Sequence, residues 1–418
     1  MSEGKKETIL VTGTSGRIGY AVAKRLAEEQ QQSFNVIGFD LKAPSHSLPG
    51  AKCLDVDLTN EESTLRGLQS IRDLHGDRIA SVIHLAAYYD FSGAPSPLYD
   101  KVTVGGTRRL LRQLQDFKVE QFIFSSTILV QAPSRHGVRI NEDSPLDIPP
   151  KWAYPKSKIE TENVIHAERG NIPAVILRIA GVYDDLCHSI PLALQIQRIY
   201  ERDPIAYFSP GDPSAGRHPY VHNDDVVDAI LRALARRKEL SPEVILLIGE
   251  TESLSYDELQ RAFGQLIYGV EWNTRAIPPL VAKTGVRLLK LLGLGRSASI
   301  APWMIDLAQD NMELDISRAR TMLGRKPQHS LRDTLPKMVS ELKADPFTWY
   351  HENELKLPRR LRKLIPVAVS TGSAKLFAAA CHDACFQEIP LVLLLRFNGL
   401  CLRYQVELQE FRATLGTF

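Results

Sequence analysis

The stretch Thr12-Gly13-Thr14-Ser15-Gly16-Arg17-Ile18-Gly19 decides the fold of this chain. It directly follows the apolar run 8–11 and opens a helical pattern that reaches Leu26. A strand, a glycine-rich turn and a helix in this order are typical of a dinucleotide site, because the helix N-terminus offers unpaired N–H groups and a positive dipole to a pyrophosphate. The glycine spacing differs from the commonest fingerprint, and an ordinary strand-to-helix turn is the alternative.

The glycines have separate roles in this interpretation. Gly13 allows the tight turn, Gly16 lets the backbone approach the pyrophosphate, and Gly19 lets the helix pack closely on the sheet. The predicted cofactor-binding residues of the turn are Gly13, Ser15, Gly16, Arg17, Ile18 and Gly19.

An acid at the end of the next strand completes the fingerprint. The run 35–39 is followed by Asp40, about 20 residues beyond the turn, where a carboxylate accepts hydrogen bonds from an adenosine ribose. Asp40 favours NAD as the cofactor, since it would repel a 2′-phosphate. Arg17 and Lys42 keep NADP open, because either cation could reach such a phosphate, and both could equally be solvated charges.

The composition indicates an ordinary globular chain. Its 418 residues are 44% hydrophobic and 24% charged, with a formal net charge of +2, which gives no electrostatic footprint for nucleic acid. The first seven residues are charged and contain no apolar signal region, and Cys53 and Cys187 stand singly, as in a reduced compartment. We therefore expect a cytoplasmic protein that does not bind nucleic acid.

Strand-like and helical patterns alternate up to residue 185, which predicts a Rossmann-type, doubly wound parallel sheet with helices on both faces. The expected strands are 8–11, 35–39, 51–54, 81–85, 121–125 and 174–177. We divide the chain into a cofactor-binding core (1–185), a smaller substrate-binding lobe (186–350), some of whose strands and helices return to the core, and a C-terminal extension (351–418). In the second part we expect helices at 189–201, 224–235 and 255–267, and strands at 219–221 and 244–248.

The extension has an unusual composition. A basic cluster at 359–363 precedes an apolar run at 389–395, which is too short to span a bilayer. The extension is either poorly ordered, docked as terminal helices, or in contact with a membrane surface. Cys381, His382, Cys385 and Cys401 fit no standard zinc spacing, so we expect no metal site.

Tyr154 and Lys158 are the candidate proton-handling pair. Their spacing of four places them on one helix face, and an ammonium beside a phenol stabilises the phenolate and lowers the pKa of the phenol toward a useful range. Lys158 could also hold a cofactor ribose. A Tyr and a Lys four residues apart are also a common helix pair without function.

Together these motifs resemble the extended short-chain dehydrogenase/reductases, the NAD-dependent epimerase/dehydratase family, over residues 8–345. The family's motifs appear in order as the 12–19 turn, Asp55-Val56-Asp57-Leu58, His84-Leu85-Ala86-Ala87, Ile123-Phe124-Ser125-Ser126-Thr127, Tyr154 to Lys158, Leu177-Arg178-Ile179-Ala180-Gly181-Val182-Tyr183 and Tyr220-Val221-His222-Asn223-Asp224-Asp225. The resemblance implies cofactor contacts at Asp57, Leu58, Leu85, Ala86, Ala87, Ser125, Tyr154, Lys158 and Ile179. It implies Tyr154, Lys158 and Thr127 as catalytic residues, and a homodimer. We assign no chemistry to His84.

The departures from the family pattern concern the substrate. Nucleotide-sugar enzymes commonly carry Asn at the position of Ala180, Gly-Pro at 184–185, and a late Arg-x-Gly-Asp element, which this chain lacks. An amphipathic stretch at 278–294 looks more like the steroid- and sterol-dehydrogenase branch, although it could also pack on the core. We therefore expect an NAD-dependent dehydrogenase or epimerase that acts on a hydrophobic secondary alcohol or ketone. The alternatives are a nucleotide-sugar epimerase and a non-catalytic NAD-binding sensor or scaffold. Region 278–294 and the extension are the candidates for peripheral membrane contact.

Overall fold

The computed structural model describes residues 6–29, 33–44, 48–148, 152–291, 304–305 and 308–358. The extension from 359 onward, its cysteines and the end of region 278–294 lie outside the described residues. The central sheet is entirely parallel and has the strand order β13-β8-β7-β5-β1-β2-β3. Its strands are β1 (Glu7–Thr12), β2 (Phe34–Asp40), β3 (Ala51–Asp55), β5 (Ser81–His84), β7 (Phe122–Thr127), β8 (Ala174–Ile179) and β13 (Glu243–Ile248). This confirms the predicted Rossmann-type fold.

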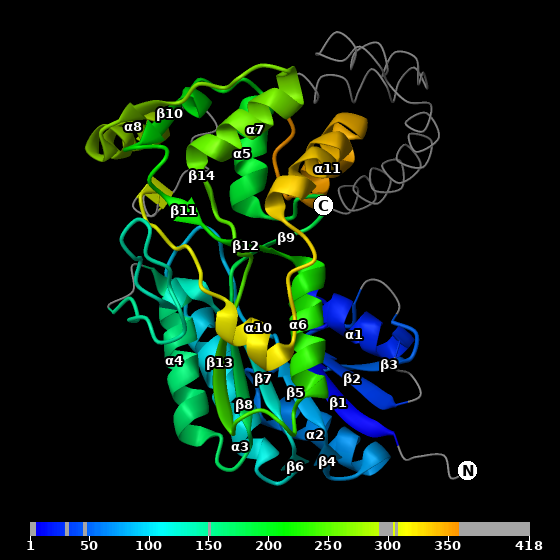
Figure 1. Ribbon diagram of the computed structural model, residues 1–418. Coiled ribbons are helices and arrows are strands. Elements are labelled where there is room, and N and C mark those ends of the chain that lie inside the picture. Colours follow the sequence, from blue (N-terminus) through cyan, green and yellow to red (C-terminus); the bar gives the residue numbers. More distant parts are fainter. Residues whose placement is uncertain are drawn as a thin grey trace, which may run out of the picture.

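Helices cover both faces of the sheet, because alternate strand residues point to opposite sides. In β1, Ile9 and Val11 pack toward one face and Leu10 toward the other. The first face is covered by α1 (Arg17–Glu29), α6 (Asn223–Ala235) and α10 (Ser317–Leu323), and the second by α2 (Glu61–His75), α3 (Gly105–Leu114) and α4 (Ala153–Glu168) (Figure 1). A π-helical turn, Tyr99–Val104, leads into α3.

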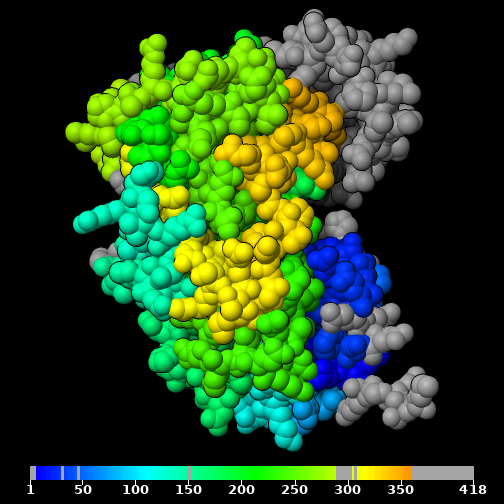
Figure 2. Space-filling model, viewed as in Figure 1, coloured from blue at the N-terminus to red at the C-terminus, as the bar shows by residue number. Residues whose placement is uncertain are grey.

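Three elements late in the sequence belong to this core. Strand β13 pairs with β8 along its whole length, and the buried faces of α6 and α10 join the same apolar cluster as α1. These are the elements of the second part that return to the core. Figure 2 shows the segment around 308–325, in yellow, lying across the front of the core.

The second lobe lies above the sheet in Figure 1 and has its own apolar core. It is built from α5 (Ile190–Tyr200), α7 (Tyr256–Tyr268), α11 (Leu331–Ala344) and α12 (Pro346–Glu352), and α8 (Pro279–Leu291) lies at its outer end. In the part of the chain that the structure describes, four short strand pairs accompany the central sheet: β4 (Arg78–Ile79) with β6 (Lys118–Val119), β9 (Gly181–Tyr183) with β12 (Tyr220–His222), β10 (Phe208–Pro210) with β15 (Arg275–Ile277), and β11 (Arg217–His218) with β14 (Leu254–Ser255). Leu355 and Leu357 still pack on this lobe, so its packing continues past residue 350.

Candidate active site

The glycine-rich turn connects β1 to α1 at the carboxyl edge of the sheet, where the strand order reverses between β1 and β5. Open α/β sheets bind ligands at such a switch point. Gly13 has a φ of +78°, and a Cβ at Gly19 would lie 2.0 Å from the Gly13 carbonyl oxygen. Only glycine fits at these two positions, so the turn is tight, and α1 begins at the switch point, where the first N–H groups of a helix have no partner within the helix.

The Asp40 carboxylate is fixed beside this turn by two backbone N–H groups. Its Oδ2 accepts a hydrogen bond from the Ser15 backbone N–H at 2.8 Å, and its Oδ1 accepts one from the Leu41 N–H at 2.7 Å. Each carboxylate oxygen retains a lone pair for a further donor. Asp40 and the glycine cradle therefore fit an adenosine ribose and pyrophosphate, and they are the residues that would hold NAD.

Arg17 has a protein partner in this structure. Its Nη1 donates a hydrogen bond to the backbone carbonyl of His188 at 2.9 Å, in the segment that leads from β9 to α5. Burial lowers the pKa of the guanidinium, against the opposing effect of Asp184. Arg17 thus ties the glycine turn to the second lobe, and its contact with a cofactor stays a prediction. The side chain of Lys42 is exposed.

The remaining predicted cofactor residues line the same edge. Asp57 Oδ1 accepts from the Thr59 N–H at 2.8 Å, while Leu58 is 6% exposed and belongs to the apolar core. Half-buried Leu85, Ala86 and Ala87 follow β5 directly, and Thr12 Oγ1 accepts from the N–H groups of Leu85 and Ala86. Their cofactor contacts stay predictions.

His84 is a structural residue. Its ring nitrogens lie 2.8 Å from the hydroxyls of Thr12 and Thr107, and the ring is fully buried. Burial, aided by the charge of Lys158, lowers the pKa of His84 to about 3, so the imidazole stays neutral. This agrees with assigning it no chemistry.

The three predicted catalytic residues come together. Tyr154 lies in the first turn of α4 and Lys158 one turn later, while Thr127 ends β7 and pairs in register with Ile179 of β8. The side chains of Tyr154 and Thr127 share a hydrogen bond. Lys158 Nζ donates to the Ser125 carbonyl at 2.6 Å and lies 5.9 Å from the centre of the Tyr154 ring. A strand end and a helix start thus place a phenol, a hydroxyl and an amine side by side.

Burial controls the protonation of this group. It raises the pKa of Tyr154 to about 12, although the hydrogen bond with Thr127 opposes the shift. Burial also lowers the pKa of Lys158 to about 7, against the effect of Glu162. The lowered phenol pKa that the Tyr-Lys spacing suggested is therefore absent here, because desolvation of the phenol outweighs the stabilisation that a partly neutral amine can give.

A buried ion pair lies one helical turn beyond Lys158. Glu162, one turn further along α4, pairs with Arg178 of β8 at 2.8 Å, and both side chains are less than 10% exposed. Ser126 donates to the same carboxylate, and Arg178 reaches the Glu142 carbonyl. The pair fixes α4 against β7 and β8, which sets the separation of Tyr154 from Thr127.

Aromatic side chains that the sequence reading missed surround Tyr154. The ring of Tyr89 lies 4.9 Å from the Tyr154 ring, edge to face, and the ring of Trp152 lies 5.6 Å away. Tyr88 packs on Tyr99 in the same way at 4.8 Å. Their position in the sequence is the available signal, since Tyr88 and Tyr89 follow the 84–87 motif and Trp152 stands two residues before Tyr154.

A glycine cradle, a ribose-reading acid and a Tyr-Lys-Thr group on a doubly wound sheet define a nicotinamide-dependent enzyme of the short-chain dehydrogenase type. The family model for the NAD dependent epimerase/dehydratase family matches residues 9–249, and the chain belongs to this family. NAD is accordingly the cofactor of this chain's family, which is a family of enzymes.

Named relatives fall into two groups. The chain is 26% identical to short-chain dehydrogenase/reductase family 42E member 1 of Macaca fascicularis over 55% of this chain and 58% of that protein. It thus spans less than two thirds of that relative's length. It is 25% identical to sterol-4-alpha-carboxylate 3-dehydrogenase erg26 of Schizosaccharomyces pombe, over 42% of this chain and 50% of that protein.

The second group consists of sugar-nucleotide epimerases. UDP-glucuronate 4-epimerase of Thermodesulfobacterium geofontis is 24% identical over 79% of this chain and 94% of that protein. A solved UDP-glucuronic acid 4-epimerase from Bacillus cereus, in complex with UDP-glucuronic acid and NAD, has a TM-score of 0.58, 22% identity, and covers 80% of this chain and 99% of its own. The likeness to the solved structure establishes the fold.

Proposed function

We propose that the protein catalyses NAD-dependent oxidation of a hydrophobic secondary alcohol, or reduction of the corresponding ketone. The observation that carries this proposal is the hydrogen-bonded Tyr154–Thr127 pair beside Lys158, at the switch point next to the cofactor cradle. NAD, when bound, supplies the acceptor or donor of the hydride. The side chains provide proton transfer and orientation.

Tyr154 is the proton-exchanging residue in this proposal. As the phenolate it takes the proton of the substrate hydroxyl during oxidation, and as the phenol it returns this proton during reduction, while the Thr127 hydroxyl holds the same oxygen. Because the pKa of Tyr154 is raised to about 12, the neutral phenol is the resting form and suits proton donation to a ketone. Proton removal from an alcohol requires the protonated form of Lys158, which favours the phenolate.

The support for an apolar substrate is the surroundings of the reacting group. Tyr89 and Trp152 pack on Tyr154, and Tyr89 remains 51% exposed, so it can contact a ligand. Aromatic surfaces of this kind favour a hydrophobic ring system over a phosphorylated sugar as the ligand.

The proposed membrane contact rests on α8. Leu280, Val281 and Leu288 are 75%, 56% and 54% exposed, and the helix also carries Lys283 and Arg287. An amphipathic helix of this kind lies on anionic lipid surfaces, where a lipid-like substrate would be collected. Among the described residues, no helix combines the length and the apolar composition that a membrane crossing requires.

Epimerisation of a nucleotide sugar is the second candidate function. In addition to the long matches with epimerases, a cavity of about 690 Å³ in the second lobe favours it. The cavity is lined by the stacked rings of Tyr207 and Trp272 together with Arg202 and Arg275, which are residue types that bind a base and a diphosphate.

Two substitutions test the proposed chemistry. Tyr154→Phe should abolish turnover with NAD affinity nearly unchanged, because it removes only the exchanging hydroxyl, whereas Lys158→Met should weaken both, since Lys158 is also assigned to the ribose. Lys156→Met, at a 65% exposed lysine of the same helix, is the matched control and should retain both. Full activity of Tyr154→Phe on an identified substrate would refute the mechanism, and a cofactor-binding protein that turns over no alcohol or sugar would favour the sensor or scaffold alternative.

The substrate class can be tested by thermal unfolding with NAD present. A ligand that binds only the folded state raises the melting temperature, so sterols and other hydrophobic alcohols should stabilise the protein more than UDP- or GDP-sugars. Stabilisation by a nucleotide sugar alone would favour the epimerase.

Co-sedimentation with anionic vesicles, compared between the natural chain and Leu280→Gln, tests the membrane contact. The homodimer and the cytoplasmic location are proposals that size-exclusion chromatography and cell fractionation address.

A further inference from the structure

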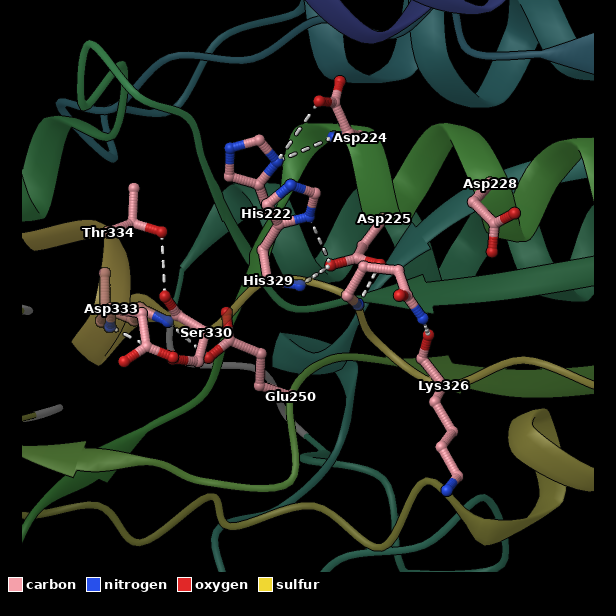
Figure 3. Close-up of polar contacts among 12 residues, drawn as sticks. His222, Asp224, Asp225, Asp228, Glu250, Lys326, His329, Ser330, Asp333 and Thr334 are labelled. Atoms are coloured by element: carbon pink, nitrogen blue, oxygen red, sulfur yellow. Dashed lines mark hydrogen bonds and ion pairs between the residues drawn. The ribbon is translucent and has the colours of Figure 1, made fainter. Parts of the chain in front are cut away.

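Two imidazoles and a carboxylate meet where α6 begins. His222 ends β12, Asp224 lies in the first turn of α6, and His329 comes from the segment between α10 and α11. One ligand atom from each residue lies within 4.8 Å of the others. Figure 3 shows the two rings against each other with Asp224 at their edge, and their centres are 4.0 Å apart.

Asp225 fixes the orientation of His329. This carboxylate is 1% exposed, and its Oδ2 lies 3.1 Å from Nδ1 of His329 and accepts from the His329 backbone N–H at 3.0 Å. Its Oδ1 accepts from Arg325 and from the Gln328 N–H, so Asp225 is anchored on both sides. From this partner we assign the proton of His329 to Nδ1, which leaves Nε2 with a lone pair. A carboxylate behind a histidine in this way is the usual support of a metal-binding imidazole.

His222 lacks one partner. It is 3% exposed, its Nδ1 accepts from the Asp224 N–H at 3.2 Å, and the same nitrogen lies 3.8 Å from the Asp224 carboxylate. Its buried Nε2 has no hydrogen-bond partner among the described residues, although Asp185 Oδ1 lies 3.8 Å away. A buried imidazole nitrogen without a hydrogen-bond partner lowers the stability of the folded protein. A hydrogen bond from His222 Nε2 to Asp185 would restore that stability.

We propose that His222, Asp224 and His329 form a binding site for a divalent transition-metal ion of the Zn²⁺ type. Two imidazoles and one carboxylate are the ligand set of three-ligand zinc sites, with water as the fourth ligand. The ion takes the lone pair of His222 Nδ1 in place of the Asp224 N–H. The Nε2–H of His222 then faces Asp185, so that each imidazole has a carboxylate behind it.

The geometry allows this with modest movement. Zinc–ligand distances of about 2.0–2.2 Å correspond to ligand separations of roughly 3.4 Å in a tetrahedron, so the three atoms must draw together and the rings must leave their stack. The side chain of Asp224 is 60% exposed and has room to turn toward the ion, and the ring of His329, 38% exposed, keeps its contact with Asp225 at Nδ1. The bound ion would fasten the 325–330 segment to the start of α6.

The experiment is a Zn²⁺ titration of the full chain, followed by thermal unfolding, together with the visible absorption spectrum of the Co²⁺-loaded protein. Asp224→Asn and His329→Gln remove one ligand each from exposed positions and leave buried His222 in place. His351→Gln, an 84% exposed histidine of α12, is the matched control. Circular dichroism verifies that each variant is folded.

We expect the melting temperature of the natural chain and of His351→Gln to rise with zinc concentration. Asp224→Asn and His329→Gln should bind about tenfold more weakly or worse. The Co²⁺ spectrum should be that of a low-coordinate site without thiolate charge transfer. Equal zinc affinity in all four proteins, no zinc-dependent shift in the natural chain, or a thiolate band that persists in both ligand variants would overturn the proposal, the last by assigning the ion to cysteines. None of these readouts depends on enzymatic activity.

Discussion

The substitution Lys158→Met should change the pH dependence of stability. Lys158 is 3% exposed, and burial lowers the pKa of its amine from 10.5 in the unfolded chain to about 7 in the folded protein. Between these pH values the unfolded chain binds a proton that the folded protein does not, so a falling pH favours unfolding of the natural chain. Below about pH 7 both states carry the proton and the penalty is constant.

The magnitude follows from this pKa difference. At about 1.36 kcal/mol per pKa unit, the gap between 10.5 and about 7 corresponds to about 5 kcal/mol of lost stability at and below neutral pH. Methionine has a similar length and no charge, so Lys158→Met removes this penalty. The lost hydrogen bond to the Ser125 carbonyl costs about 1 kcal/mol at every pH. The variant should therefore be more stable than the natural chain near pH 7 and lose this advantage as the pH approaches 10.5.

The assay is urea unfolding of the cofactor-free proteins at several pH values from 7 to 10.5, since bound NAD would add its own stabilisation. Lys156→Met removes a 65% exposed lysine of the same helix and should change stability by about 0.5 kcal/mol or less. A difference between Lys158→Met and the natural chain that is the same at every pH would refute the argument, because it would mean that Lys158 remains solvated in the folded protein.

The remaining predictions concern the cofactor and the buried ion pair. NADH should bind more tightly than NADPH in fluorescence titrations; tenfold tighter NADPH, about 1.4 kcal/mol, would contradict the role of Asp40. Gly19→Ala should weaken NADH binding by about tenfold or more, because its Cβ would lie 2.0 Å from the Gly13 carbonyl, whereas Gly285→Ala meets no atom within 4 Å and should bind normally; unchanged binding in Gly19→Ala would show that the turn relaxes. Arg178→Met leaves Glu162 buried without its partner and should cost about 3–5 kcal/mol in urea unfolding, while Arg66→Met, at a pair exposed on both sides, should cost at most about 1 kcal/mol; similar losses would mean that burial does not matter here. Removal of residues 359–418 should leave NADH binding intact, since every predicted cofactor residue precedes them, and a folded truncation without binding would disprove the assigned boundary.

Features of short sequence range were predictable. The glycine turn, the acid at Asp40 and the Tyr154–Lys158 spacing each lie within one strand-turn-helix unit or one helical turn, where local geometry alone decides which residues meet. The alternation of strands and helices also predicted the parallel sheet, because each strand-helix-strand unit is continuous in the sequence. The place of β13 at the sheet edge beside β8 is set instead by pairing between segments that are far apart in the sequence.

The tertiary structure alone decided the electrostatics and the long-range contacts. The sequence spacing suggested that Lys158 lowers the pKa of Tyr154, but burial depends on everything packed around both groups, and it moves the two pKa values to about 12 and about 7. Likewise, Arg17 meets the His188 carbonyl because the second lobe packs against the core, and His222 meets His329 because the segment between α10 and α11 passes the start of α6. Cysteine and histidine spacing predicted no metal site, since the proposed ligands are separated by about a hundred residues and no local pattern joins them. Local geometry is set by a few neighbouring residues. The burial of a side chain and the meeting of distant metal ligands depend instead on how the entire chain packs.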